Sequence, residues 1–200
     1  SKDRTLLVLA DDQRLYGLPD YDDGGLDADL KANPENYVLM SGLQGIQQIA
    51  HDTQTGTTYL LDRTSRRLLI ADRSFENVIE KSIPNVVPLD PQGDGGVDFK
   101  CDAMGNLFFN VEGSNQLWKV HGETGEAVML GELMTQELRG YDFDDNGNLL
   151  VNDAGKVRCF TFAEEGLEET GNAGSPFAGV EVGKGLSIDR ASSNYDPKHH

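Results

Sequence analysis

Apolar and polar residues alternate in short runs along this chain, and the clearest run covers residues 140–153, with the sequence GYDFDDNGNLLVND. Tyr141 and Phe143 flank Asp142, which is the period of a strand with two unlike faces. The Asn-Gly pair at 146–147 favours a tight hairpin turn, because both residues tolerate positive φ angles. The apolar triplet Leu-Leu-Val that follows is typical of a buried strand. This run therefore predicts a strand, a turn and a second strand.

The same order of strand, turn and strand recurs through the chain, while no helical periodicity of comparable length occurs. The high glycine content, 23 residues, also favours many turns over long helices. The predicted strands cover residues 5–10, 14–18, 36–40, 45–49, 58–61, 67–70, 77–79, 96–99, 107–109, 116–120, 127–130, 140–143, 149–151, 156–160, 167–170 and 185–189.

Glycines mark the start of four of these strands, at Gly45, Gly96, Gly140 and Gly185. Their spacing of about 45–50 residues, with four strands in each interval, indicates a β-propeller. An immunoglobulin-like sandwich would also be all-β, but it does not account for the internal repetition. The sequence therefore predicts an all-β fold made of four-stranded blades.

The number of strands favours four blades in one domain over residues 1–198. The N-terminus supplies three strands of one blade, three full blades follow, and the strand at 185–189 supplies the fourth strand of the N-terminal blade. That closure leaves no unpaired strand edge. Five blades, or a fragment of a larger propeller, remain open as alternatives, and residues 199–200 are interpreted as the remnant of a purification tag.

The unit at 140–151, Gly-φ-x-φ-Asp-x-x-Gly-Asn-φ-φ-φ, resembles the repeat of NHL-type and gluconolactonase-like propellers, and residues 102–107 match it more loosely. This resemblance implies a metal-dependent hydrolase or lyase whose site holds a divalent ion with a Glu, an Asn and an Asp at the mouth of the central channel. Asp98 and Asp142 are the carboxylates that could serve there, while the glutamate has no match in this sequence.

The net charge of the chain argues against two classes of binding partner. A net charge of −17 argues against binding to nucleic acid or to an anionic membrane surface, since both require a basic face. No apolar run is long enough for a transmembrane helix. Cys101 and Cys159 lie in different predicted strands and are interpreted as free thiols, with a disulfide as the alternative. The compartment stays open, with an extracellular or periplasmic location favoured.

One residue of each inner strand, two positions after the repeat glycine, is expected to face the channel: Gln47, Asp98, Asp142 and Ser187. Carboxylates confined in such a channel repel one another unless a cation, a proton or water lies between them. Calcium or sodium, held by Asp98 and Asp142, is therefore the candidate cation, and a water-filled channel without a specific ion is the alternative.

Two further places carry candidate binding residues. The acidic loop at 20–29 offers Asp20, Asp22 and Asp27 as a second possible calcium site. Asp62 and Asp153 follow predicted second strands, at the end of the blades where binding loops of propellers lie. Residues 142–153 also match part of an EF-hand loop, but an extended strand after the turn carries Asp153 too far away to close such a loop.

The sequence contains no Ser-His-Asp, HExxH or phosphate-cradling pattern. We therefore expect a non-catalytic module that binds a protein or a glycan on one propeller face. A metal-dependent hydrolase or lyase and a structural domain of a larger surface or toxin protein are the two alternatives.

Overall fold

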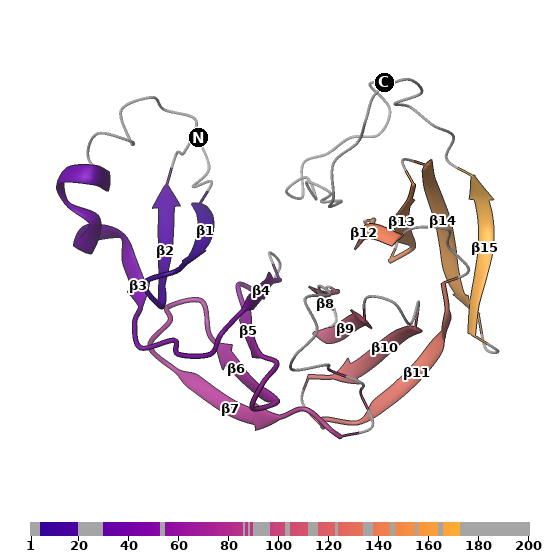
Figure 1. Cartoon of the computed structure of the whole chain (residues 1–200), viewed down its shortest axis with the longest axis horizontal. Coiled ribbons are helices and arrows are strands. Elements are labelled where there is room, and N and C mark those ends of the chain that lie inside the picture. The colour runs from indigo at the N-terminus through magenta and orange to yellow at the C-terminus, as the bar shows by residue number, and fades with distance from the viewer. Residues whose placement is uncertain are drawn as a thin grey trace. The chain divides into compact units, whose positions relative to one another are not determined.

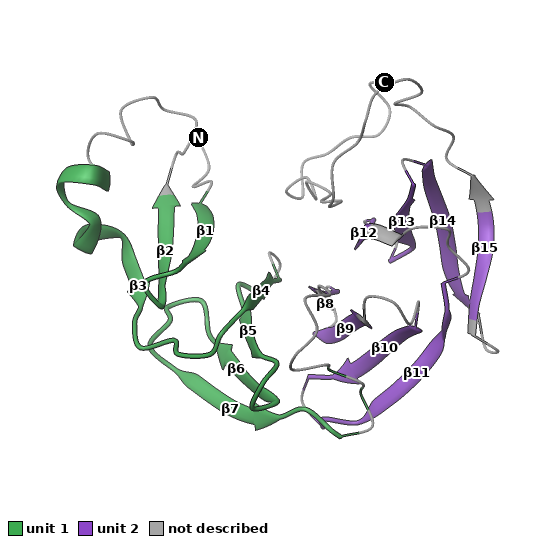
Figure 2. Ribbon diagram, viewed as in Figure 1, with its two compact units in different colours: residues 1–93 green, residues 94–200 purple. Residues whose placement is uncertain are grey.

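The structure, a computed structural model, describes residues 5–19, 30–52, 55–85, 87, 89, 97–102, 105–111, 116–122, 124–133, 138–144, 147–154, 156–163 and 166–172. The chain divides into two compact units, residues 1–93 and 94–200, which are coloured separately in Figure 2. Each unit is described by itself below. The expectation of one domain over residues 1–198 stays a prediction.

The first unit contains two antiparallel sheets in which consecutive strands are neighbours (Figure 1). The first has the described strands β1 (Thr5–Ala10), β2 (Arg14–Pro19) and β3 (Val38–Met40), with a 3₁₀ helix, η1 (Pro34–Tyr37), directly before β3. The second has β4 (Gln48–His51), β5 (Thr58–Asp62), β6 (Arg67–Ala71) and β7 (Val78–Ser82).

The second unit repeats the four-stranded pattern twice. One sheet is formed by β8 (Val97–Cys101), β9 (Asn106–Val111), β10 (Gln116–His121) and β11 (Ala127–Glu132). The other is formed by β12 (Leu138–Phe143), β13 (Leu149–Asp153), β14 (Lys156–Ala163) and β15 (Gly166–Asn172). The first strands of the two sheets, β8 and β12, lie against each other, as do the last strands, β11 and β15.

The described strands thus form four successive antiparallel sheets, and the predicted all-β, four-bladed propeller fold is confirmed. The fifteen predicted strands between residues 5 and 170 are all present, with ends shifted by a few residues. One shift has a clear cause. Gly45 was expected to open an inner strand, but its φ of +80° places it in a turn, and β4 begins only at Gln48.

Apolar side chains between neighbouring sheets hold each unit together. In the first unit, Leu15, Leu43 and Leu60 form a buried cluster against which side chains of the first two sheets pack. In the second unit, Phe108 of β9 packs against Phe143 of β12, with ring centroids 4.4 Å apart. The hydroxyl of Tyr141, which is fully buried, donates a 3.0 Å hydrogen bond to the backbone carbonyl of Phe108.

The strand predicted at 185–189, which would close the N-terminal blade, lies outside the described residues, so that closure stays a prediction. Neither Cys101 nor Cys159 forms a disulfide, and the first is buried and the second partly buried. In the part of the chain that the structure describes, no helix has the length and apolarity needed to cross a membrane.

Candidate functional site

A pocket of about 430 Å³ opens at one end of the first unit, where the β1–β2 turn meets the loop that leads into β4. The two segments are joined by a hydrogen bond of 3.0 Å from the backbone N–H of Leu43 to the carbonyl of Gln13. The pocket is lined by both aliphatic and polar residues. Its lining consists of Leu9, Ala10, Asp11, Gln13, Leu43, Gly45, Ile46 and Gln47.

The loop wall of this pocket is fixed by the β5–β6 turn. The side-chain carbonyl of Gln47 accepts a 2.8 Å hydrogen bond from the backbone N–H of Arg63, and its amide donates to the hydroxyl of Thr64 at 3.2 Å. The guanidinium of Arg67 donates to the carbonyl of Gln44 at 2.8 Å. Gln47, which the sequence assigned to a channel ring, therefore stabilises the pocket wall through both polar atoms of its side-chain amide.

Asp62, predicted as a binding residue at this end, is buried and stabilises the same turn. Its carboxylate accepts hydrogen bonds from the backbone N–H and the hydroxyl of Ser65, and it lies 3.4 Å from the guanidinium of Arg67. A Cβ atom on Gly45 would lie only 2.6 Å from Oδ2 of Asp62. The loop therefore passes so close to the turn that the pocket wall requires glycine at position 45.

Asp153 has an analogous place in the second unit, at the start of the β13–β14 turn. It is buried and forms an ion pair of 3.1 Å with Arg158, whose guanidinium also pairs with Glu169 at 2.6 Å and lies over the ring of Phe160. The hydrogen bond to Glu169 and then the one to Asp153 raise the pKa of Arg158, and the hydrogen bond from Arg158 lowers the pKa of Glu169. The carboxylate of Asp153 thus takes part in a network that ties β13, β14 and β15 together.

The strand register separates the residues expected to form one ring. In the first hairpin of each four-stranded sheet, the backbone N–H of an aspartate donates a hydrogen bond across the turn. These aspartates therefore occupy equivalent positions, and they are Asp52, Asp102 and Asp144. Asp142 lies two residues before Asp144, Asp98 lies four residues before Asp102, and Gln47 lies five residues before Asp52. Asp98 and Asp142 thus share a strand face at levels roughly 7 Å apart, and Gln47 has the opposite parity.

Of these residues, Asp142 is buried on β12, and its Oδ1 accepts a 2.9 Å hydrogen bond from the backbone N–H of Phe143. For Asp98 the structure describes the backbone in β8 but not the side chain. Ser187 lies outside the described residues, as do the three aspartates of the acidic loop, Asp20, Asp22 and Asp27. The calcium sites proposed for Asp98 with Asp142 and for the acidic loop therefore stay predictions.

The hairpin that resembles part of an EF-hand is closed by its own side chains. Both carboxylate oxygens of Asp144 accept hydrogen bonds from Asn148, one from its backbone N–H and one from its side-chain amide, each at 2.8 Å. Asp102 and Asn106 repeat this arrangement, at 2.9 and 2.7 Å. Among the side chains that the structure describes, no three His, Cys, Asp or Glu residues come together as a metal site.

The sequence predicted the end of the sheet at which the pocket lies, but not the pocket residues Gln13, Leu43 and Ile46. Gly45, with the polar Gln47 two positions later, is the one local signal, and the repeat pattern predicts a strand start there. The contact of the β1–β2 turn with a loop thirty residues later leaves no periodic trace in the sequence.

Comparison with solved structures supports the fold. A gluconolactonase from Xanthomonas campestris superposes with a TM-score of 0.53 at 12% identity, over 86% of this chain and 58% of that chain. The resemblance to gluconolactonase-like propellers is confirmed for the fold. An auxiliary nutrient binding protein from Bacteroides thetaiotaomicron gives a TM-score of 0.51 at 11% identity, over 82% of this chain and 38% of that one.

A crystal structure of a nidogen–laminin complex is similar as well, with a TM-score of 0.50 at 15% identity over 88% of this chain and 67% of the other. The chain therefore spans only part of the length of each of these propeller proteins. No protein-family model matches the sequence, and no curated protein is similar to it in sequence.

Proposed function

We propose that this chain is a non-catalytic binding module and that it holds a protein or glycan partner at the end of the first unit that carries the pocket. The observation that carries this proposal is the pocket itself, whose volume of about 430 Å³ lies within the range of ligand sites. Its lining also joins aliphatic side chains to polar groups, the two kinds of group that ligand sites combine.

The pocket is also preformed. Backbone hydrogen bonds fix Leu43 to the β1–β2 turn and Gln47 to β5, the latter through its N–H and the carbonyl of Leu61 at 2.9 Å. The side chain of Gln47 adds two more bonds to the β5–β6 turn. A ligand therefore meets a wall that is already ordered, which lowers the entropy cost of binding.

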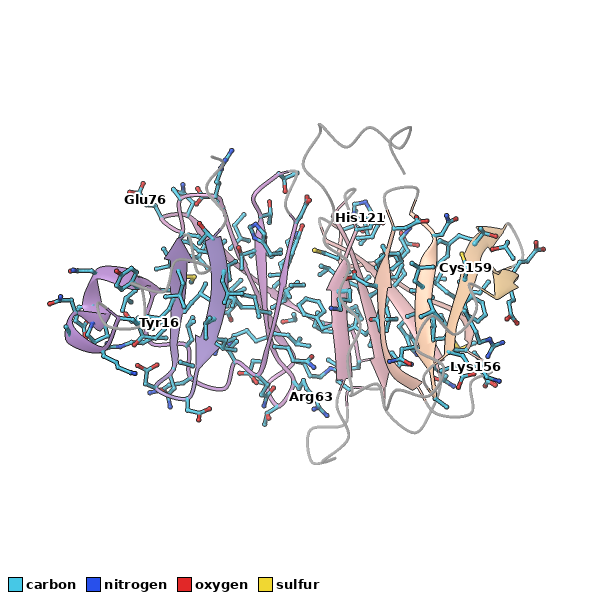
Figure 3. The ribbon with its side chains drawn as sticks, turned by 90° about the horizontal axis from the view of Figure 1, so that it is seen from above. Tyr16, Arg63, Glu76, His121, Lys156 and Cys159 are labelled. Atoms are coloured by element: carbon cyan, nitrogen blue, oxygen red, sulfur yellow. The ribbon has the colours of Figure 1, made fainter. Side chains whose placement is uncertain are left out.

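The test is to screen the full chain on a glycan array and on a peptide array, and to repeat the screen with Gln47→Ala. Removing the two side-chain bonds of Gln47 loosens the pocket wall, so we expect the affinity for any ligand to fall. Glu76→Ala is the control, because Glu76 is exposed at the opposite end of the strands from Arg63 (Figure 3).

A ligand whose binding depends on Gln47 but not on Glu76 would support the module. The proposal fails if no array yields a ligand, or if Gln47→Ala leaves all binding unchanged. Turnover of a sugar lactone that requires a divalent cation would instead favour the hydrolase alternative implied by the gluconolactonase resemblance.

A further inference from the structure

We propose that the pocket takes the cationic side chain of a lysine or arginine from a partner protein. This inference rests on the proposed binding function and names the chemistry of the ligand. The pocket has one charged lining residue among those described, Asp11, at the rim. Leu9, Leu43 and Ile46 contribute aliphatic side chains to the lining.

These two features fit the two parts of a basic side chain. Lysine and arginine pack their aliphatic stems on apolar surface while their charged heads stay near water. In this pocket the stem would lie on Leu9 and Ile46, which are partly exposed, and the head would reach the carboxylate of Asp11. A sugar hydroxyl can donate a hydrogen bond to this carboxylate, but a cationic head gains a hydrogen bond and a charge attraction together. An acidic peptide would be repelled by it.

The carboxylate of Asp11 is available for this role. Among the described residues it has no hydrogen-bond or ion-pair partner, and its side chain is exposed at the turn. The neighbouring Asp12 differs, because its carboxylate accepts a 2.6 Å hydrogen bond from the hydroxyl of Tyr16 and lies 3.9 Å from the guanidinium of Arg14. The turn thus has one engaged carboxylate and one free carboxylate, and the free one lines the pocket.

The charge of the whole chain acts in the same direction. A net charge of −17 raises the local concentration of a cationic partner and speeds its association. Such steering is weakened by salt, whereas the contact of the stem with the aliphatic lining residues is not. A basic partner should therefore show an association rate that falls with ionic strength and a residual affinity that persists at high salt.

The test uses three tripeptides, acetyl-Gly-X-Gly-amide with X as lysine, norleucine or glutamate, titrated into the full ¹⁵N-labelled chain. We expect the lysine peptide to shift the amide resonances of Gln13, Leu43 and Ile46 in a saturable way. Norleucine has a similar apolar stem without the charge, so its affinity should be about fivefold lower, as expected for one partly exposed ion pair. The glutamate peptide should not bind.

Two variants of equal net charge separate a local contact from the general field. Asp11→Asn should weaken the lysine peptide about fivefold and leave the norleucine peptide unchanged. Asp12→Asn removes the same charge one residue away, outside the pocket, and should change the lysine affinity less than twofold.

The proposal is overturned if lysine and norleucine bind equally, if Asp12→Asn weakens binding as much as Asp11→Asn, or if the shifts lie elsewhere. A glycan that binds in a Gln47-dependent way, without lysine-peptide binding, would leave the module standing and remove the cationic ligand. Absence of binding by glycans and by every peptide would contradict both proposals.

Discussion

The paired aspartate and asparagine that close the β12–β13 hairpin provide the sharpest test of how the repeats are stabilised. Asp144→Ala removes the acceptor of two hydrogen bonds from Asn148, both at 2.8 Å. A hydrogen bond to a charged group contributes about 1.5–3 kcal/mol, and partial solvent access at this turn places the sum of the two near the upper end of that range. We therefore expect the free energy of unfolding to fall by about 2–3 kcal/mol.

The measurement is urea unfolding of the full chain, with the midpoint compared at unchanged slope. For a chain of this size the same loss lowers Tm by about 5–10 °C. Asp102→Ala should cost a similar amount, because Asp102 and Asn106 make the same pair of bonds in the preceding sheet. Glu126→Ala is the control, since its side chain is exposed beside another turn, and it should change stability by less than about 0.5 kcal/mol.

A double-mutant cycle with Asn148→Ala decides whether the stabilisation comes from this pair. We expect a coupling energy of about 1 kcal/mol or more between Asp144 and Asn148. Additive losses, or an Asp144→Ala variant as stable as the parent, would refute the reasoning. A calcium-dependent rise in Tm that Asp144→Ala abolishes would instead show that the hairpin tip binds an ion.

Three further predictions follow from other turns and edges. Gly45→Ala should lower the free energy of unfolding by about 2–3 kcal/mol in thermal unfolding, and Gly42→Ala by about 1 kcal/mol. Both glycines have positive φ, but only Gly45 lies close to the side chain of Asp62. Equal losses in the two variants would contradict this contact. Hydrogen bonds from the side chains of Asn77 and Ser74 lower the pKa of Asp72 from 3.8 to about 2. The carboxylate therefore stabilises the fold fully above pH 4, and this stabilisation is lost as the pH falls through 2. Asp72→Asn should therefore make Tm less dependent on pH between pH 4 and 2, and the same dependence of Tm on pH in the variant would contradict this. Deleting residues 185–200 should lower Tm and promote self-association in size-exclusion chromatography if 185–189 pairs with β1, and a stable monomer would contradict that pairing.

The fold could be predicted from the sequence because its signals are local. Alternating or continuously apolar runs mark the strands, and Gly-Asn after an aspartate marks the first hairpin of the two sheets of the second unit, at Asp102 and Asp144. The structure gives the second signal a physical reason, since the asparagine bonds both oxygens of the aspartate and the glycine takes a positive φ. Asp, Gly and Asn also produced the partial match to an EF-hand loop. The hydrogen bonds between aspartate and asparagine explain why these residue types occur at the turn, and this explanation needs no ion.

The candidate site could be predicted only in outline, because it depends on which residue is used as the reference for counting. Counting from the repeat glycine aligned Gln47 with Asp98 and Asp142, and it assigned all of them to one ring. The backbone hydrogen bond of the turn aspartate fixes the register of the hairpin. Counted from that aspartate, Gln47 has the opposite parity to Asp98 and Asp142, and it lies just before β4, bonded to the β5–β6 turn. Variation in the length of the segment between the glycine and the turn therefore places a polar residue in a pocket wall in one sheet and in an inner strand in another, while the hairpin itself stays the same.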